Sequence, residues 1–153
     1  EMCIRDRGNL DAADTWYLKK APKDPLHFDA LKRYQYLTQA VVELVAGQTK
    51  KVFLTLAPMD SYCKACGRHL DKISTDLLRA MALYREQDER WHEYLKTALT
   101  EAENYRFVRP ASVFGGAILP LLDELSPAAA ACGAPASPFA RGRGESEKAF
   151  REL

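Results

Sequence analysis

The apolar run at residues 52–57 organises the pattern of hydrophobic and polar positions along this chain. Its six residues read VFLTLA, and Pro58 follows directly. A short run that is apolar on both faces is typical of a central strand in a parallel sheet, which helices cover on each side. The pattern therefore predicts a strand over Val52–Ala57, followed by a loop from residue 58 to residue 70.

Helical spacing flanks this strand on both sides. Upstream, Asp24 and Pro25 form a typical capped helix start and Gly47 a typical stop, which predicts a helix over Leu26–Ala46. Its apolar face would consist of Leu31, Tyr34, Leu37, Val41, Leu44 and Val45. Downstream, apolar residues follow a helical period from Ile73 to Ala102. The polar interval at 85–90 indicates either one long exposed helix or two helices that meet there.

The remaining segments complete an alternating order of helices and strands. Residues 8–24 are expected to form a polar loop, Tyr105–Val108 a second and shorter strand, and 118–125 a short helix. This order predicts the α/β class, as a fragment of a three-layer α/β/α (flavodoxin-like) domain with a parallel sheet. Residues 8–125 would form that domain. Residues 126–153 are rich in alanine, proline and glycine near their start and are expected to be a poorly ordered tail.

Composition narrows the choice of partners. A chain of 153 residues predicts a single domain, and 47% hydrophobic residues are enough for a core. The formal net charge of +1 gives no reason to expect nucleic acid or an anionic membrane as a partner. No apolar run reaches the roughly 18 residues that a transmembrane helix needs.

The two ends of the chain suggest an internal fragment. Residues 1–7 read EMCIRDR, which resembles the translation of a sequencing-library adapter and is expected to be a non-native scar that includes Cys3. Residues 150–153 follow a helix-like pattern without a cap.

Cys63, Cys66 and His69 are the main candidates for chemistry. The two cysteines are spaced as a zinc half-site, with His69 as a third ligand and Cys132 as one possible fourth. The same spacing also suits a redox pair, a structural disulfide that staples the loop, or two free thiols. A c-type haem site is excluded, because Gly67 stands where that motif needs histidine.

Other polar and aromatic residues have simpler interpretations. Gly8-Asn9 alone is typical of a turn. His27 and His92 are expected at the surface or in packing, and the charged run 86–93 on a solvated helical face. The aromatic residues expected in the core or at an interface are Trp16, Tyr17, Tyr34 and Tyr36.

The order of elements resembles the middle of an SGNH (GDSL-type) hydrolase of the phospholipase B-like branch. The segment at 8–11, GNLD, is similar to the family's Gly-Gly-Asn-Asp block, with Leu10 in place of an aspartate. The segment at 105–114, YRFVRPASVF, resembles the family's strand that runs into a Gln-Pro-Phe-Phe-like turn. No nucleophile block is present, and Asp123 has Ser126 where the family's Asp-x-x-His dyad has histidine.

The resemblance implies a serine esterase or lipase that acts on a small-molecule or lipid ester, without a cofactor, in a secreted or lumenal location. Asn9, next to Gly8, would then donate a hydrogen bond in the oxyanion hole. Such a fragment would be inactive as it stands, and an inactive relative of the family is a further possibility. The alternative is a small zinc-binding or helical interaction module that uses Cys63, Cys66 and His69 and presents its long helix to a partner.

Overall fold

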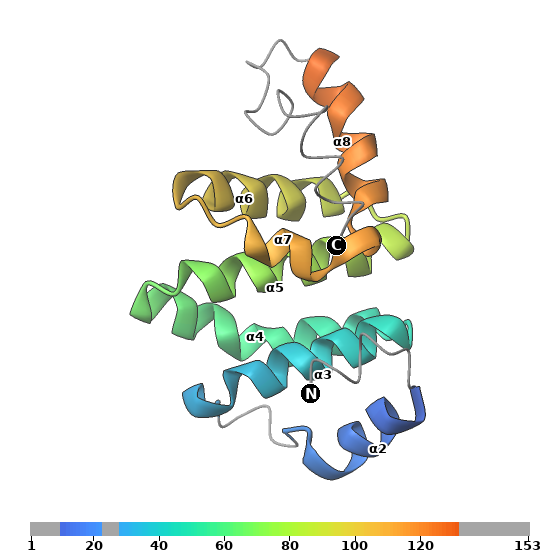
Figure 1. Ribbon diagram of the computed structural model, residues 1–153, viewed down its shortest axis with the longest axis vertical. Helices are drawn as coiled ribbons and strands as arrows, with labels where there is room; N and C mark the ends of the chain where they lie inside the picture. Colours follow the sequence, from blue (N-terminus) through green and yellow to red (C-terminus); the bar gives the residue numbers. More distant parts are fainter. Residues whose placement is uncertain (1–9, 23–27, 132–153) are drawn as a thin grey trace. The chain divides into compact units, whose positions relative to one another are not determined.

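The computed structural model describes residues 10–22 and 28–131, and every regular element in this part of the chain is helical (Figure 1). The α-helices are α2 (Leu10–Lys20), α3 (Arg33–Val45), α4 (Thr49–Cys66), α5 (His69–Arg85), α6 (Trp91–Asn104), α7 (Arg109–Val113) and α8 (Leu119–Ala131). Two short 3₁₀ helices join them, η1 (Ala30–Lys32) and η2 (Gly115–Ala117). The predicted α/β class is therefore wrong, since the described residues contain no strand.

The predicted strand at 52–57 lies inside α4. The buried residues of this helix are Thr49, Val52, Thr55, Leu56, Met59 and Cys63. Their spacing of three or four residues is the period of a helix with one face in the core. Leu54, by contrast, is 66% exposed. The six-residue window was too short to separate a buried strand from one stretch of a longer amphipathic helix.

Pro58 does not end this helix, although the sequence predicted a loop from there to residue 70. A proline in a helix interior removes one backbone hydrogen bond and costs about 3 kcal/mol. The buried stripe continues past it to Met59 and Cys63, and the helix ends only at Gly67, which adopts a left-handed conformation with φ of 59°. Burial of this apolar face offsets the cost of the proline.

Two of the sequence-based predictions about helices are confirmed. The interval at 85–90 separates α5 from α6, which confirms the alternative of two helices that meet there. Gly47 follows the C-terminal end of α3 with a left-handed φ of 73°, which glycine adopts without steric cost.

The predicted face of α3 is wrong. Its buried residues are Tyr36, Ala40 and Glu43, whereas Leu31 is 89% exposed and Tyr34 and Val45 are also exposed. The segment begins at η1, where the Asp29 carboxylate accepts a hydrogen bond from the Leu31 amide at 3.0 Å. Asp24, Pro25 and His27 lie outside the described residues.

The chain divides into two compact units, residues 1–107 and residues 108–153. In the first unit, α3, α4, α5 and α6 pack against their neighbours in chain order, and α2 packs against α3 (Figure 1). Helix α5 contacts α3, α4 and α6, and eleven of its seventeen residues are buried. The largest fully buried apolar side chains of this unit are Leu56, Met59, Ile73, Leu77, Leu78 and Leu95.

The second unit contains α7, η2 and α8, of which η2 and α8 are in contact. The strand predicted at Tyr105–Val108 is a turn that leads to α7, and Arg106 adopts a left-handed φ of 55° there. The predicted short helix at 118–125 corresponds to the start of α8, which runs from Leu119 to Ala131. Gly8, Asn9 and Cys132 lie outside the described residues, as do the whole of the predicted scar and most of the predicted tail.

The described helices include none with both the length and the apolar character of a membrane span. The polar loop expected before Asp24 is also a helix for most of its length, because α2 covers Leu10–Lys20 and buries Trp16.

Candidate functional site

The turn between α4 and α5 places Arg68 near α3 and His69 near α6. Gly67 closes α4, and the Arg68 amide donates a hydrogen bond to the Cys63 carbonyl at 2.9 Å. The next residue, His69, begins α5. Arg68 joins a cluster with α3, and His69 joins one with α6, so the turn links three helices of the first unit.

The first cluster consists of two arginines around one buried carboxylate. The Asp71 side chain is 2% exposed, and its Oδ2 atom lies 3.0 Å from Nε of Arg68 and 3.6 Å from Nε of Arg33. The Asp71 hydrogen bond and charge raise the pKa of Arg68. A buried carboxylate requires partners of this kind, because moving an unpaired charge out of water is strongly unfavourable.

Aromatic rings lie beside this arginine cluster. The Arg33 guanidinium lies 4.5 Å from the ring centroid of Tyr34, which is a cation–π distance. Phe28 packs against Tyr36 and Tyr62 with centroid separations of 5.0 and 5.1 Å. The cluster therefore combines guanidinium donors with partly exposed aromatic surface.

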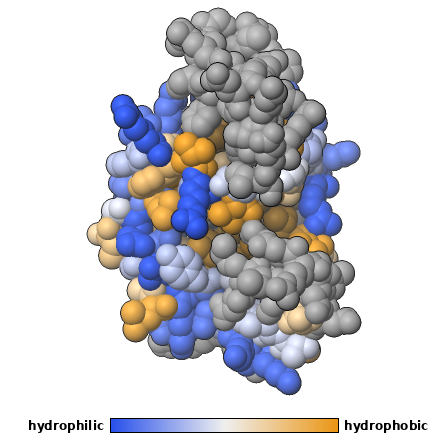
Figure 2. Space-filling view, in the orientation of Figure 1, coloured by the Kyte–Doolittle hydropathy of each residue, from blue (hydrophilic) through white to orange (hydrophobic). Residues whose placement is uncertain are grey.

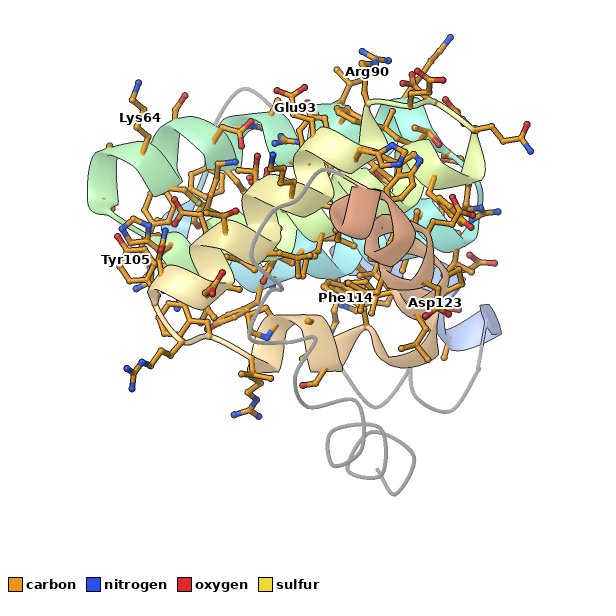
Figure 3. All side chains as sticks on the ribbon, turned by 90° about the horizontal axis from the view of Figure 1, so that it is seen from above. Lys64, Arg90, Glu93, Tyr105, Phe114 and Asp123 are labelled. Carbon is orange, nitrogen blue, oxygen red and sulfur yellow. The ribbon has the colours of Figure 1, made fainter. Side chains whose placement is uncertain are left out.

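The second cluster is formed by His69, a carboxylate that pairs with its ring nitrogen, and an aromatic ring that stacks on it. Its Nδ1 atom lies 2.9 Å from Oε2 of Glu101, and its ring stacks on Tyr105 with centroids 3.9 Å apart. Tyr105 in turn stacks on Phe107 at 5.9 Å, and 45% of Tyr105 is exposed. Figure 3 shows Tyr105 and Lys64 at the same end of the helices, opposite to Arg90. We call this end, formed by both clusters and Lys64, the turn end.

A second charged network contains equal numbers of cations and carboxylates, with Arg79 and Asp76 buried and Asp60 and Lys72 partly exposed. The Arg79 guanidinium makes two hydrogen bonds to Asp60 at 2.9 and 2.7 Å, and Lys72 lies 2.5 Å from Asp76. Arg79 also lies within 6 Å of the rings of Phe53 and Tyr94. With two cations and two carboxylates, this network joins α4, α5 and α6 without surplus charge.

Glu43 is the third buried polar centre. Its Oε1 atom accepts hydrogen bonds from Tyr17 at 3.0 Å and Gln39 at 2.9 Å, and its Oε2 accepts one from Thr55 at 2.8 Å. These donors connect α2, α3 and α4 through one carboxylate. All three donors are neutral. These hydrogen bonds give Glu43 a structural role, because they hold the three helices together.

The predicted cysteine site separates into two environments. Both cysteines are free thiols, with Cys63 buried in the core and Cys66 exposed, so the disulfide predicted between them is not present. Among the described residues, no three histidine, cysteine or acidic side chains form a group that could hold a metal ion. His69 instead pairs with Glu101. Burial, followed by the nearby carboxylates of Asp71 and Asp60, raises the pKa of Cys63 to about 11.

The other residues that the sequence singled out are found in packing or surface positions. His92 is exposed and stacks on Trp91 at 3.6 Å, which confirms a surface or packing role. Trp16 and Tyr36 are buried as expected, whereas Tyr34 is exposed. In the charged run at 86–93, Asp88 and Arg90 form an exposed ion pair at 2.6 Å.

Sequence reasoning missed most of the turn end, including Arg33, Arg68, Asp71, Glu101 and Tyr105. A local signal existed only for Arg68 and Asp71, whose spacing of three residues suits an ion pair once a helix start is recognised. The contacts of Arg33 with Asp71 and of His69 with Glu101 join residues more than 30 positions apart, and no local pattern encodes them.

Comparisons with known protein families, with curated proteins and with solved structures find no match to this chain.

Proposed function

We propose that this chain is a helical protein-interaction module that binds a partner protein through the turn end. The supporting observation is that exposed aromatic and cationic side chains there are held in fixed positions. Glu101 pairs with His69, on which Tyr105 stacks, and Asp71 pairs with Arg68. This is the helical interaction module that the sequence offered as an alternative, without a requirement for zinc.

The residue types at the turn end are those that interfaces favour. Tyrosine, phenylalanine and arginine are enriched at protein–protein interfaces and supply most of their strongest contacts. Fixing a side chain before binding reduces the conformational entropy that binding would otherwise cost, about 0.5–1.5 kcal/mol for each side chain. The His69–Tyr105–Phe107 stack and the Arg68–Asp71 pair are therefore suited to contact a partner without large rearrangement.

The charge distribution supports a protein partner rather than a nucleic acid. The chain has 22 lysine and arginine residues against 21 aspartate and glutamate residues, so cations are not in large excess. Figure 2 shows hydrophilic and hydrophobic residues interspersed on the visible coloured surface. A nucleic-acid surface would gather lysine and arginine on one face.

The ester-hydrolase hypothesis stays a prediction about residues that the structure does not describe, chiefly Asn9 and Gly8. The layout on which it depended required a strand at 52–57, where the chain forms α4. A small-molecule or lipid ester substrate belongs to that hypothesis alone.

A capture experiment with matched variants tests the proposed function. The wild-type chain, Tyr105→Ala and Leu54→Ala are immobilised and exposed to the same cell extract, and bound proteins are quantified by mass spectrometry. Leu54 is the control, because it is a similarly exposed apolar residue on α4. We expect Tyr105→Ala to reduce capture of a defined protein by about tenfold or more, the effect of losing one strong interface residue. Leu54→Ala should retain it.

The proposal is overturned if wild type and Tyr105→Ala retain the same proteins in the same amounts. Circular dichroism and thermal melting of both variants show whether they keep the helical fold. A loss of capture together with loss of helicity is resolved by Tyr105→Phe, which keeps the stacked ring and should restore capture.

A further inference from the structure

We infer that Arg33 and Arg68 form an anion site that binds a carboxylate of an acidic segment in the partner protein. The inference rests on the proposed function and specifies the chemistry of the partner. It is carried by the charge balance, the hydrogen-bond geometry and the position of the arginine cluster.

The cluster has a surplus positive charge. Arg33 and Arg68 converge on the same Oδ2 atom of Asp71, so two cations share one carboxylate. Asp71 is buried, whereas the arginine side chains are 24% and 38% exposed. One unit of positive charge therefore remains at the surface, where an incoming anion can reach it.

Arg33 is held by charge more than by hydrogen bonds. Its Nε atom is buried, lies 3.6 Å from Asp71, and has no hydrogen-bond partner in the described part of the chain. Its Nη1 atom makes one long bond of 3.4 Å to the Ala30 carbonyl. A guanidinium carries five N–H donors. The Nε–H of Arg33 is buried, so an incoming oxygen ligand would bind at the Nη groups, one of which also bonds the Ala30 carbonyl.

The geometry favours a carboxylate over a phosphoryl group. One surplus charge matches a monoanion, and the planar guanidinium fork matches the two oxygens of a carboxylate. A phosphoryl dianion would need a further cation in the same cluster. A polyanionic nucleic acid would need a row of cations, whereas Glu101 on the other side of the turn is acidic.

The neighbouring rings predict the type of residue that lies next to that carboxylate in the partner. Tyr34 lies against Arg33 on one side of the turn, and Tyr105 stacks on His69 on the other. An acidic side chain next to an aromatic side chain would therefore fit the turn end, the acid on the arginines and the ring on Tyr34 or Tyr105.

A pair of synthetic peptides tests the carboxylate requirement. One peptide alternates glutamate and tyrosine, and the other alternates glutamine and tyrosine, both with blocked ends and a fluorescent label. Binding to the full chain is measured by fluorescence anisotropy and by amide NMR shifts. We expect the glutamate peptide to bind and to shift the amides at residues 33–34 and 68–71, and the glutamine peptide to bind at least about tenfold more weakly. Equal binding of the two peptides would overturn the inference.

Variants of the cluster separate a specific site from general attraction. Arg33→Gln should weaken binding of the glutamate peptide by about tenfold, and Arg33→Lys should restore it only in part, because lysine keeps the charge and loses the fork. Lys51→Gln, at the opposite end of α4, removes the same charge from an exposed position and should leave binding unchanged. Equal weakening by Arg33→Gln and Lys51→Gln would contradict a site at Arg33.

Inorganic phosphate is the competing anion. If millimolar phosphate displaces the glutamate peptide more strongly than acetate at equal ionic strength, the site prefers a phosphoryl group and the carboxylate assignment is wrong. Failure of the peptide to bind, with capture still dependent on Tyr105, would overturn this inference alone. Capture independent of Tyr105 would overturn the proposed function by a separate measurement.

Discussion

Cys63 and Cys66 show at the scale of single residues how one helical turn separates two chemical environments. They are three positions apart near the end of α4, yet one thiol lies in the core and the other is exposed. The spacing suggested a shared function to sequence reasoning. The orientation of the helix instead assigns packing to Cys63 and leaves Cys66 at the surface.

This difference predicts selective alkylation. With its pKa raised to about 11, Cys63 is almost entirely the unreactive thiol at pH 8, whereas Cys66 is exposed. We expect iodoacetamide to label Cys66 at least about tenfold faster than Cys63 in the folded chain. Peptide mass spectrometry over a time course measures both rates. Labelling in denaturant is the control, and similar rates in the folded chain would contradict the burial of Cys63.

At the scale of elements, buried polar side chains join neighbouring helices in addition to the apolar core. Glu43 connects α2, α3 and α4 through Tyr17 and Thr55, and Arg79 connects α4 and α5 through Asp60. Buried carboxylates are tolerated when each oxygen has donors, and each missing donor leaves a penalty of about 1–3 kcal/mol.

The Glu43 centre makes a prediction about α2. Tyr17→Phe removes the hydrogen bond that the Tyr17 hydroxyl of α2 donates to the Glu43 carboxylate, while keeping the aromatic ring. We expect faster hydrogen exchange at the amides of α2, with little change in α5. Thr55→Val removes the donor to the other oxygen and should lower the free energy of unfolding by about 1–3 kcal/mol.

Exchange measured by NMR or mass spectrometry and chemical denaturation check these two outcomes. Thr38→Val is the matched control for Thr55→Val, since the Thr38 hydroxyl donates to the carbonyl of Tyr34 in its own helix. Equal effects of the two threonine variants would show that Glu43 does not depend on Thr55.

At the scale of the whole molecule, the internal charges make stability depend on pH. Burial raises the pKa of Asp76 above its ordinary value of 3.8, against the lowering effects of Lys72 and Arg79, while Asp60 adds a small raising effect. The folded chain therefore binds a proton at Asp76 more readily than the unfolded chain does. Its contribution to stability falls as pH rises from about 3.8 through the raised pKa.

Asp76→Asn tests this dependence. The variant has no ionisable group at this position, so we expect its stability relative to wild type to increase as pH rises through that interval. Thermal melts at a series of pH values measure the difference. Asp88→Asn is the control for an exposed pair, because Arg90 lowers the pKa of Asp88 to about 2 and gives the opposite sign at lower pH. A relative stability of Asp76→Asn that falls with pH would contradict the burial effect.

The sequence by itself determined those features that depend on neighbouring residues. The helical period from Ile73 to Ala102 with its break at 85–90, the stop at Gly47 and the surface position of His92 follow from local spacing and backbone preference. Each concerns residues within a few turns of one another, so the pattern contains the necessary information.

Only the tertiary structure decided whether 52–57 is a strand or a helix, which face of α3 is buried, and how the turn end is assembled. Over six residues the apolar run is compatible with the period of a strand and with that of a helix. The burial of Thr49, Met59 and Cys63 on either side of it shows the helical period. The pairs Arg33–Asp71 and His69–Glu101 form because α3, α5 and α6 pack together. Contacts between residues far apart in the chain depend on that packing, and therefore the candidate site became visible only in the folded molecule.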